Sequence, residues 1–168
     1  MAVGRVAWSV TTGAAVALAA STAKSVIGVK SDSNKGFKLT EIDVSFDATD
    51  ATKGPVLVEL CSCTFGANAP GTNSTSLTPA FTSGQSANTD DISAARNWTT
   101  EPTTLTVLKE WQIDSNKGQL IFQFPQGREP EAVNGGGFVI RCTSGSGSTP
   151  NVRASMEVEE FFLTSSFG

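Results

Sequence analysis

Histidine and tyrosine are both absent from this chain of 168 residues. Without histidine there is no imidazole to act as a general base near neutral pH, no Ser-His or Cys-His nucleophile pair, and no imidazole metal ligand. Carboxylate or lysine chemistry stays open in principle. The absence of histidine weighs against an enzyme, and we predict no catalytic residues.

Charge is also scarce. Charged residues make up 17% of the chain and the net charge is -4, whereas soluble domains typically carry about 25% charged residues. The chain therefore lacks the basic patch expected of a nucleic-acid-binding protein. Serine, threonine, asparagine and 16 glycines take the place of charge, which is common in all-β proteins with many turns. The length suits one domain with a core that needs no metal or disulfide.

Cysteine is limited to Cys61, Cys63 and Cys142. An odd number leaves at least one thiol unpaired, which argues weakly against an oxidising compartment. Cys61 and Cys63 would share one face of a strand. A zinc site would need two further donors, and only one further cysteine exists. We therefore predict small buried hydrophobic side chains, with no metal and no cofactor.

Helical periodicity is hard to find after the first twenty or so residues, whereas the alternation typical of half-buried strands is plentiful. Segments rich in Gly, Asn, Asp, Ser and Pro separate the alternating runs. The expected strands are 6–10, 25–30, 37–46, 54–63, 104–113, 119–124, 137–142 and 151–163. About eight strands without intervening helices predict an all-β fold, an antiparallel β-sandwich that is jelly-roll-like.

The alternation also predicts which side chains face inward. In 37–46 the apolar parity changes near Thr40 and Glu41, as one extra residue in a β-bulge would cause. One parity of 104–113 holds Leu105, Val107, Lys109, Trp111 and Ile113. In 151–163, Val152, Ala154, Met156 and Val158 are expected inward, with Arg153, Ser155, Glu157 and Glu159 outward.

Residues 64–101 break this rhythm as a long irregular excursion that is poor in large apolar residues. A connection of this length in a compact domain is usually functional or disordered. We expect it to pack on the sandwich or on a neighbouring molecule, with Phe81, Ile92 and Trp98 as anchors. Within it, "DDISAARNW" favours one or two helical turns capped by Asp90 or Asp91.

The N-terminal stretch Gly13–Ser25 has parts of a secretory signal peptide: Arg5 before it, an apolar run, and a small-residue end. The apolar run is short, however, and Val16 and Leu18 alternate as in an extended segment. We interpret it as part of the mature protein and expect no membrane partner. The predicted organisation is an N-terminal arm or first strand at 1–23 and a single β-sandwich domain at 24–168.

The pentapeptide Asp-Ser-Asn-Lys-Gly occurs twice, at Asp32–Gly36 and Asp114–Gly118. Paired ion-binding loops are one interpretation, but neither copy has the downstream bidentate glutamate of a calcium loop. We favour the same tight turn in two hairpins.

Glu157 and Glu159 share the outward face of the last predicted strand. Paired carboxylates in a cleft can perform acid-base chemistry, but no other polar constellation supports them. We interpret them as a device that protects an edge strand from aggregation, or as a subunit contact.

Several stretches in one order resemble small structural proteins of tailed bacteriophages. The matching residues are Ser45-Phe46-Asp47, Pro55-Val56, Val58-Glu59-Leu60, Glu101-Pro102-Thr103, Gly127-Arg128-Glu129, Ile140-Arg141-Cys142-Thr143 and Glu159-Glu160. The resemblance covers roughly residues 24 to 160 and contains no catalytic signature. The long 64–101 insertion and the tail after Glu160 depart from the family plan.

The resemblance implies a virion component, a head decoration (cement) protein made in the host cytoplasm that binds the outer capsid surface. Its partners would be the major capsid protein and further copies of itself in a homotrimer. Apolar residues near both ends would then form arms that pack on neighbours: Val3, Val6, Trp8, Phe161, Phe162, Leu163 and Phe167. The alternative is a carbohydrate-binding jelly-roll module of a phage fibre or secreted protein, which would need one of Trp8, Trp98 or Trp111 exposed in a groove.

Overall fold

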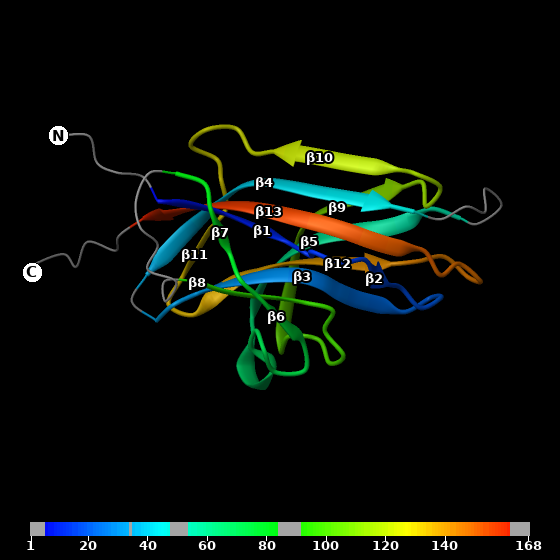
Figure 1. Ribbon diagram of the computed structural model, residues 1–168, viewed down its shortest axis with the longest axis horizontal. Coiled ribbons are helices and arrows are strands. Elements are labelled where there is room, and N and C mark those ends of the chain that lie inside the picture. The colour runs from blue at the N-terminus through cyan, green and yellow to red at the C-terminus, as the bar shows by residue number, and fades with distance from the viewer. Residues whose placement is uncertain (1–5, 34, 48–53, 84–91, 162–168) are drawn as a thin grey trace, which may run out of the picture.

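The chain folds into two antiparallel sheets packed face to face in a computed structural model that describes residues 6–33, 35–47, 54–83 and 92–161 (Figure 1). The seven-stranded sheet runs β10 (Gln119–Gln123), β4 (Gly36–Phe46), β13 (Asn151–Phe161), β1 (Ala7–Thr11) and β7 (Ala80–Phe81); β11 (Glu131–Val133) pairs with β4, and β2 (Val16–Ala17) with β13. The six-stranded sheet runs β6 (Thr75–Leu77), β8 (Ile92–Arg96), β3 (Ala23–Ser31), β12 (Gly136–Thr143), β5 (Val56–Thr64) and β9 (Thr104–Ile113). The all-β antiparallel sandwich is confirmed.

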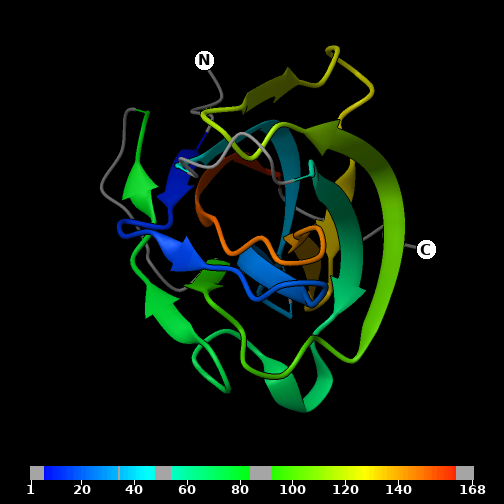
Figure 2. The same cartoon turned by 90° about the vertical axis from the view of Figure 1, so that its right-hand side faces the viewer.

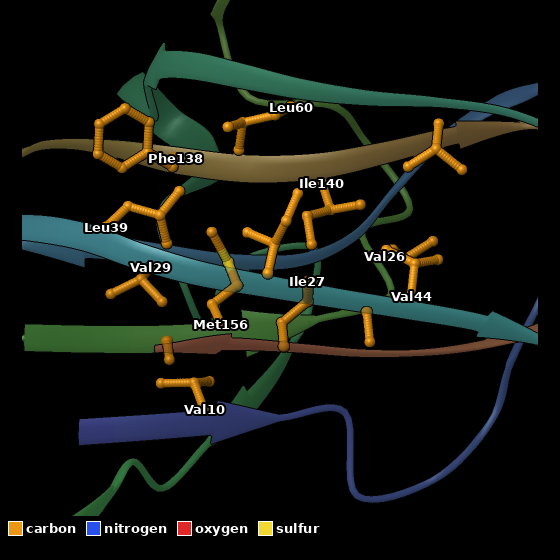
Figure 3. Close-up of a cluster of buried hydrophobic side chains, with 14 of the residues drawn as sticks. Val10, Val26, Ile27, Val29, Leu39, Val44, Leu60, Phe138, Ile140 and Met156 are labelled. Carbon is orange, nitrogen blue, oxygen red and sulfur yellow. The ribbon is translucent and has the colours of Figure 1, made fainter. Parts of the chain in front are cut away.

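The core lies between the two sheets, where side chains from both layers meet (Figure 3). Phe37 of β4 and Phe138 of β12 meet edge to face with ring centroids 5.8 Å apart, and so join the sheets. The inward residues predicted for the last strand, Val152, Ala154, Met156 and Val158, all belong to this core. The period-2 pattern of the longer strands therefore located the core correctly.

The predicted bulge in β4 is confirmed. Val158 of β13 lies opposite Leu39 and Glu157 lies opposite Glu41, so Thr40 is the extra residue. Its hydroxyl donates a hydrogen bond to the Glu157 carbonyl oxygen at 3.1 Å. The bulge moves Ile42 onto the same inner face as Leu39.

A second bulge, in β9, makes the predicted common face of 104–113 wrong. Cys61 of β5 lies opposite Val107 while Leu60 lies opposite Lys109, which leaves Leu108 as the extra residue. Side chains before and after the bulge therefore face opposite ways. Trp111 and Ile113 pack on the main core, Leu105 packs outside the sheet, and Val107 is 42% exposed.

The 64–101 excursion is more regular than predicted. It holds a short 3-10 turn at Gly66–Asn68 and supplies β6, β7 and β8 to the two sheets, with β6 at the edge of the six-stranded sheet next to β8 (Figure 1). The predicted helical turns are wrong, because Ile92–Arg96 pairs with β3 as strand β8. Pairing with that open edge outweighs the helix propensity of its alanines. Asp90 and Asp91 lie outside the described residues. The three anchors, Phe81, Ile92 and Trp98, do pack on the sandwich.

The N-terminal segment is built into the sandwich. Strand β1 lies between β13 and β7, and Trp8, Val10, Val16 and Leu18 belong to the core. The interpretation of Val6 and Trp8 as parts of an arm is wrong, because both pack on this core. Phe161 is half-buried at the end of β13. The other residues assigned to arms, Val3, Phe162, Leu163 and Phe167, lie outside the described residues.

The repeated pentapeptides do not form hairpins. Asp32–Gly36 leads from β3 to β4 and Asp114–Gly118 from β9 to β10, so each carries the chain from the six-stranded to the seven-stranded sheet. In the second copy the backbone N–H of Asn116 donates a hydrogen bond to Asp114 Oδ1 at 2.8 Å. The second copy thus uses its Asp and Asn in a turn, whereas the prediction of two hairpins is wrong because the following strand lies in the other sheet. These crossings give the chain its jelly-roll-like course between the sheets.

Candidate functional site

Glu157 and Glu159 point outward from β13, as predicted, but β13 lies between β4 and β1. The interpretation as an edge-strand device is therefore wrong. Glu159 lies opposite Lys38 of β4, whereas Glu157 lies opposite Glu41. The two glutamates belong to different surroundings on the outer face of the seven-stranded sheet.

Three carboxylates, Glu41, Asp43 and Glu157, form what we call the carboxylate row on that face. Glu157 lies opposite Glu41 on one side and Ser9 on the other. Side chains directly opposite each other on antiparallel strands are about 5 Å apart at Cβ, and like charges there are destabilising. The row thus keeps an unfavourable arrangement in the middle of a sheet.

The environment of Glu157 reflects this arrangement. Burial raises the pKa of its carboxyl group above the ordinary value, and the nearby Glu41 and Asp43 carboxylates raise it further. A hydrogen bond with the Ser9 side chain acts in the opposite direction and favours the charged form of Glu157. The carboxyl group of Glu157 therefore holds its proton more tightly than a solvated glutamate does.

Only one of the two carboxylate oxygens of Asp43 has a hydrogen-bond partner. Its Oδ2 accepts a hydrogen bond from the Ser155 hydroxyl at 3.0 Å. Its Oδ1 is closed off from solvent and has no hydrogen-bond partner. Because buried polar atoms are nearly always paired, an orphaned carboxylate oxygen marks a place where the fold leaves acceptor capacity unused.

A groove of about 300 Å³ lies beside Asp43, and we call it the polar groove. It is lined by Thr11, Thr12, Gly13, Asp43, Ser45, Arg153, Ala154 and Ser155. Arg153 lies opposite Ser45, and its Nη1 donates to the Gly13 carbonyl oxygen at 3.4 Å. Hydroxyls, one carboxylate and one guanidinium thus converge on one shallow site, which suits binding of a small polar ligand.

The outer face of the six-stranded sheet is built differently. Its covering cluster consists of Cys61, Cys63, Phe65, Ala95, Trp98 and Val139. Trp98 is 1% exposed, stacks on Phe65 with ring centroids 6.1 Å apart, and donates from Nε1 to the Asn68 carbonyl oxygen at 3.0 Å. The excursion therefore closes this face with a second small core.

The cysteines behave as the predicted buried hydrophobic side chains. Cys142 lies in the main core, and Cys61 and Cys63 lie in the covering cluster. Burial raises the pKa of Cys61 to about 11 and that of Cys63 to about 12, so neither is a ready nucleophile. Within the described ranges no group of three or more Cys, Asp or Glu side chains could hold a metal ion.

The tryptophans that a carbohydrate-binding module would expose are turned inward. Trp8 and Trp98 are each 1% exposed, and half-buried Trp111 packs on Phe122 with ring centroids 5.3 Å apart. None of the three is free to form a stacking platform for a sugar ring.

Several residues of the phage-like pattern hold the fold together. Glu59 and Arg141 form a two-pronged ion pair with N–O distances of 2.8 and 2.9 Å. Asp47 Oδ1 accepts a hydrogen bond from the backbone N–H of Asn151 at 3.0 Å. Lys35 Nζ and Glu160 Oε1 form an ion pair at 2.9 Å. These residues of the pattern therefore belong to the framework of the sandwich.

Comparison with known proteins adds no identification: no family model, no curated protein and no solved structure matches the chain. Across the part of the chain that the structure describes, no helix has the length and apolar character needed to span a membrane.

Sequence reasoning missed the roles of Ser9, Glu41 and Asp43, and it missed the polar groove. The outward parity of Arg153, Ser155 and Glu157 was available from the last strand alone. Their partners on β4 and β1 depend on strand order, which alternation within a single strand does not encode.

Proposed function

We propose that this chain is a virion structural protein, a head decoration (cement) protein that binds the outer surface of a phage capsid and stabilises it. The observation that supports this proposal is the pairing within the phage-like pattern. Val58-Glu59-Leu60 and Ile140-Arg141-Cys142 are far apart in sequence, yet they lie on the adjacent strands β5 and β12 and are joined by the Glu59–Arg141 ion pair. In this chain, two separate parts of the pattern thus come together on one sheet.

In this role the major capsid protein is the partner and the protein works as a homotrimer. Each copy bridges neighbouring shell subunits with a rigid sandwich, and the binding energy adds to the shell's resistance to internal pressure. Closed cyclic symmetry is the usual way for identical copies to meet. The outer face of the seven-stranded sheet has no covering hydrophobic cluster among the described residues and offers a polar surface for such contacts.

Light scattering after size-exclusion chromatography, followed by mixing with expanded empty capsids, tests the proposal. The capsids are assembled from the major capsid protein encoded in the same genome. We expect a particle of three times the 17.5 kDa chain mass that sediments with the capsids, and we expect the chain in purified virions by mass spectrometry. A monomer that leaves the capsids unlabelled would contradict both the partner and the oligomeric state.

A further inference from the structure

The polar groove carries groups of opposite charge that the fold does not use up. Asp43 lines the groove, and its Oδ2 accepts one hydrogen bond, from the Ser155 hydroxyl, of the two that a carboxylate oxygen can accept. Arg153 is exposed, and the structure gives its five N–H groups one long hydrogen bond, to the Gly13 carbonyl oxygen at 3.4 Å. Both acceptor and donor capacity therefore remain at the same groove.

The chemistry of the groove selects a class of ligand. One carboxylate and one guanidinium give the lining a formal charge of zero, so an ion of either sign meets attraction at one end and repulsion at the other. An apolar ligand would strand these polar groups without water. A hydroxyl group both donates and accepts, and therefore suits a site that offers Asp43, Arg153 and the hydroxyls of Thr11, Ser45 and Ser155 together.

We propose that the polar groove binds one ring of a neutral saccharide, with one ring hydroxyl donating to Asp43 and another accepting from Arg153. A volume of about 300 Å³ lies at the lower end of the range for small-molecule sites, which fits a single ring. The lining contains no aromatic side chain, so the dissociation constant is expected on the order of 1 mM or weaker. Several copies held together would multiply this affinity through avidity. The proposal does not depend on capsid binding.

Amide chemical shifts of the full ¹⁵N-labelled chain provide the test. The probes are the methyl glycosides of glucose, galactose, mannose and N-acetylglucosamine, with Nα-acetyl-lysine amide and methyl phosphate as charged controls. We expect at least one glycoside to produce saturable shifts at Thr12, Gly13 and Ser155, and we expect neither charged control to do so.

Variants then separate a groove site from a general surface effect. Asp43→Asn and Arg153→Gln should each weaken glycoside binding by about tenfold or more, since each removes a charged hydrogen-bond partner. Glu131→Gln makes the same charge change as Asp43→Asn at an exposed position on β11 of the same sheet and should leave binding unchanged. Thr11→Gln, at the exposed rim, should block the groove without touching the core.

The outcomes decide the proposal in both directions. Shifts that appear with a glycoside and are lost in the Asp43, Arg153 and Thr11 variants support it. The absence of saturable shifts with all four glycosides overturns it, as does unchanged binding in all three groove variants. Binding of a charged control in place of the glycosides would show that the ligand class is wrong.

Discussion

The two outer faces of the sandwich differ in how they treat polar and apolar groups. On the six-stranded sheet the chain returns to cover its own strands and buries Trp98 and Phe65. The buried Glu59 and the half-buried Arg141 form a close ion pair there. On the seven-stranded sheet the described residues form no such outer cluster, so we call this outer face the bare face. There Glu157 lies opposite another carboxylate, that of Glu41.

This difference separates a face that stabilises the fold from one that does not. Residues that lower the stability of the fold without an evident compensating gain are expected at functional positions. The bare face has three such features: like charges opposite each other, an orphaned Asp43 oxygen, and a groove with unused hydrogen-bonding capacity. It is therefore the stronger candidate for contact with another molecule.

The lateral edge of the sandwich is less suited to docking by strand addition. Figure 2 views the strands end-on and shows β9 curving along this edge beside β10. The Leu108 bulge interrupts the ladder of β9, and the ammonium of Lys109 lies 5.1 Å from the Phe122 ring centroid. Bulges and inward-pointing lysines both protect exposed edges from pairing.

The largest expected effect on stability concerns the covering cluster on the six-stranded sheet. Trp98→Ala should lower the free energy of unfolding by about 3–5 kcal/mol, because it removes a fully buried aromatic side chain and leaves a cavity. Gly28 lies against the Trp98 ring and has no side chain that could move into this cavity. Urea denaturation measures the change.

Ile121→Ala is the matched control on the other sheet, because Ile121 is 63% exposed on β10. It should change the free energy of unfolding by less than about 0.5 kcal/mol. A loss of similar size for Trp98 and Ile121 would show that the cover contributes no more than an ordinary surface.

The next effect concerns the paired charges of the covered face. Arg141→Gln should lower the free energy of unfolding by about 2 kcal/mol, because it leaves the carboxylate of Glu59, a residue that is only 7% exposed, without its cation. Lys38→Gln removes the cation of the exposed Lys38–Glu131 pair, which has an N–O distance of 3.5 Å. Denaturation should detect less than about 0.5 kcal/mol there. Equal losses in the two variants would contradict the distinction between buried and exposed pairs.

Much of the fold follows from period-2 alternation. The inward residues of β13, the bulge at Thr40 and the core position of Cys142 were all predictable because each depends on one strand and its two faces. The short strands β6, β7 and β8 were not predictable in this way. β7 pairs with the edge of β1 and β8 with the edge of β3, both distant in the sequence, and β6 pairs in turn with β8.

The candidate site shows the same limit more sharply. The outward direction of Glu157 follows from the parity of its own strand, whereas its opposition to Glu41 depends on the β4–β13 register and on one bulge. The orphaned Asp43 oxygen depends in addition on which hydroxyl of β13 lies opposite. Predicting such contacts between strands requires the strand order. The repeated Asp-Ser-Asn-Lys-Gly turns did not give this order, because each leads to the other sheet and not to the neighbouring strand.

The smallest effect tests the bare face directly. Glu157→Gln should raise the free energy of unfolding at pH 7 by about 0.5 kcal/mol, because it removes one of two like charges that lie opposite each other. The pKa of Glu157 in the folded state is raised above its ordinary value of 4.5. The folded state therefore binds more protons than the unfolded state between 4.5 and that raised pKa, and stability falls as pH rises through this window.

The gain from Glu157→Gln should thus be fullest above the raised pKa and should shrink as the pH falls toward 4.5. Urea denaturation at a series of pH values measures this dependence. Glu131→Gln is the control, because Glu131 is an exposed glutamate that lies opposite Lys38, and its removal should bring no gain at pH 7. If Glu157→Gln destabilised the protein at neutral pH, the hydrogen bond with Ser9 would outweigh the repulsion from Glu41, and the bare face would be a stabilising surface like the covered one.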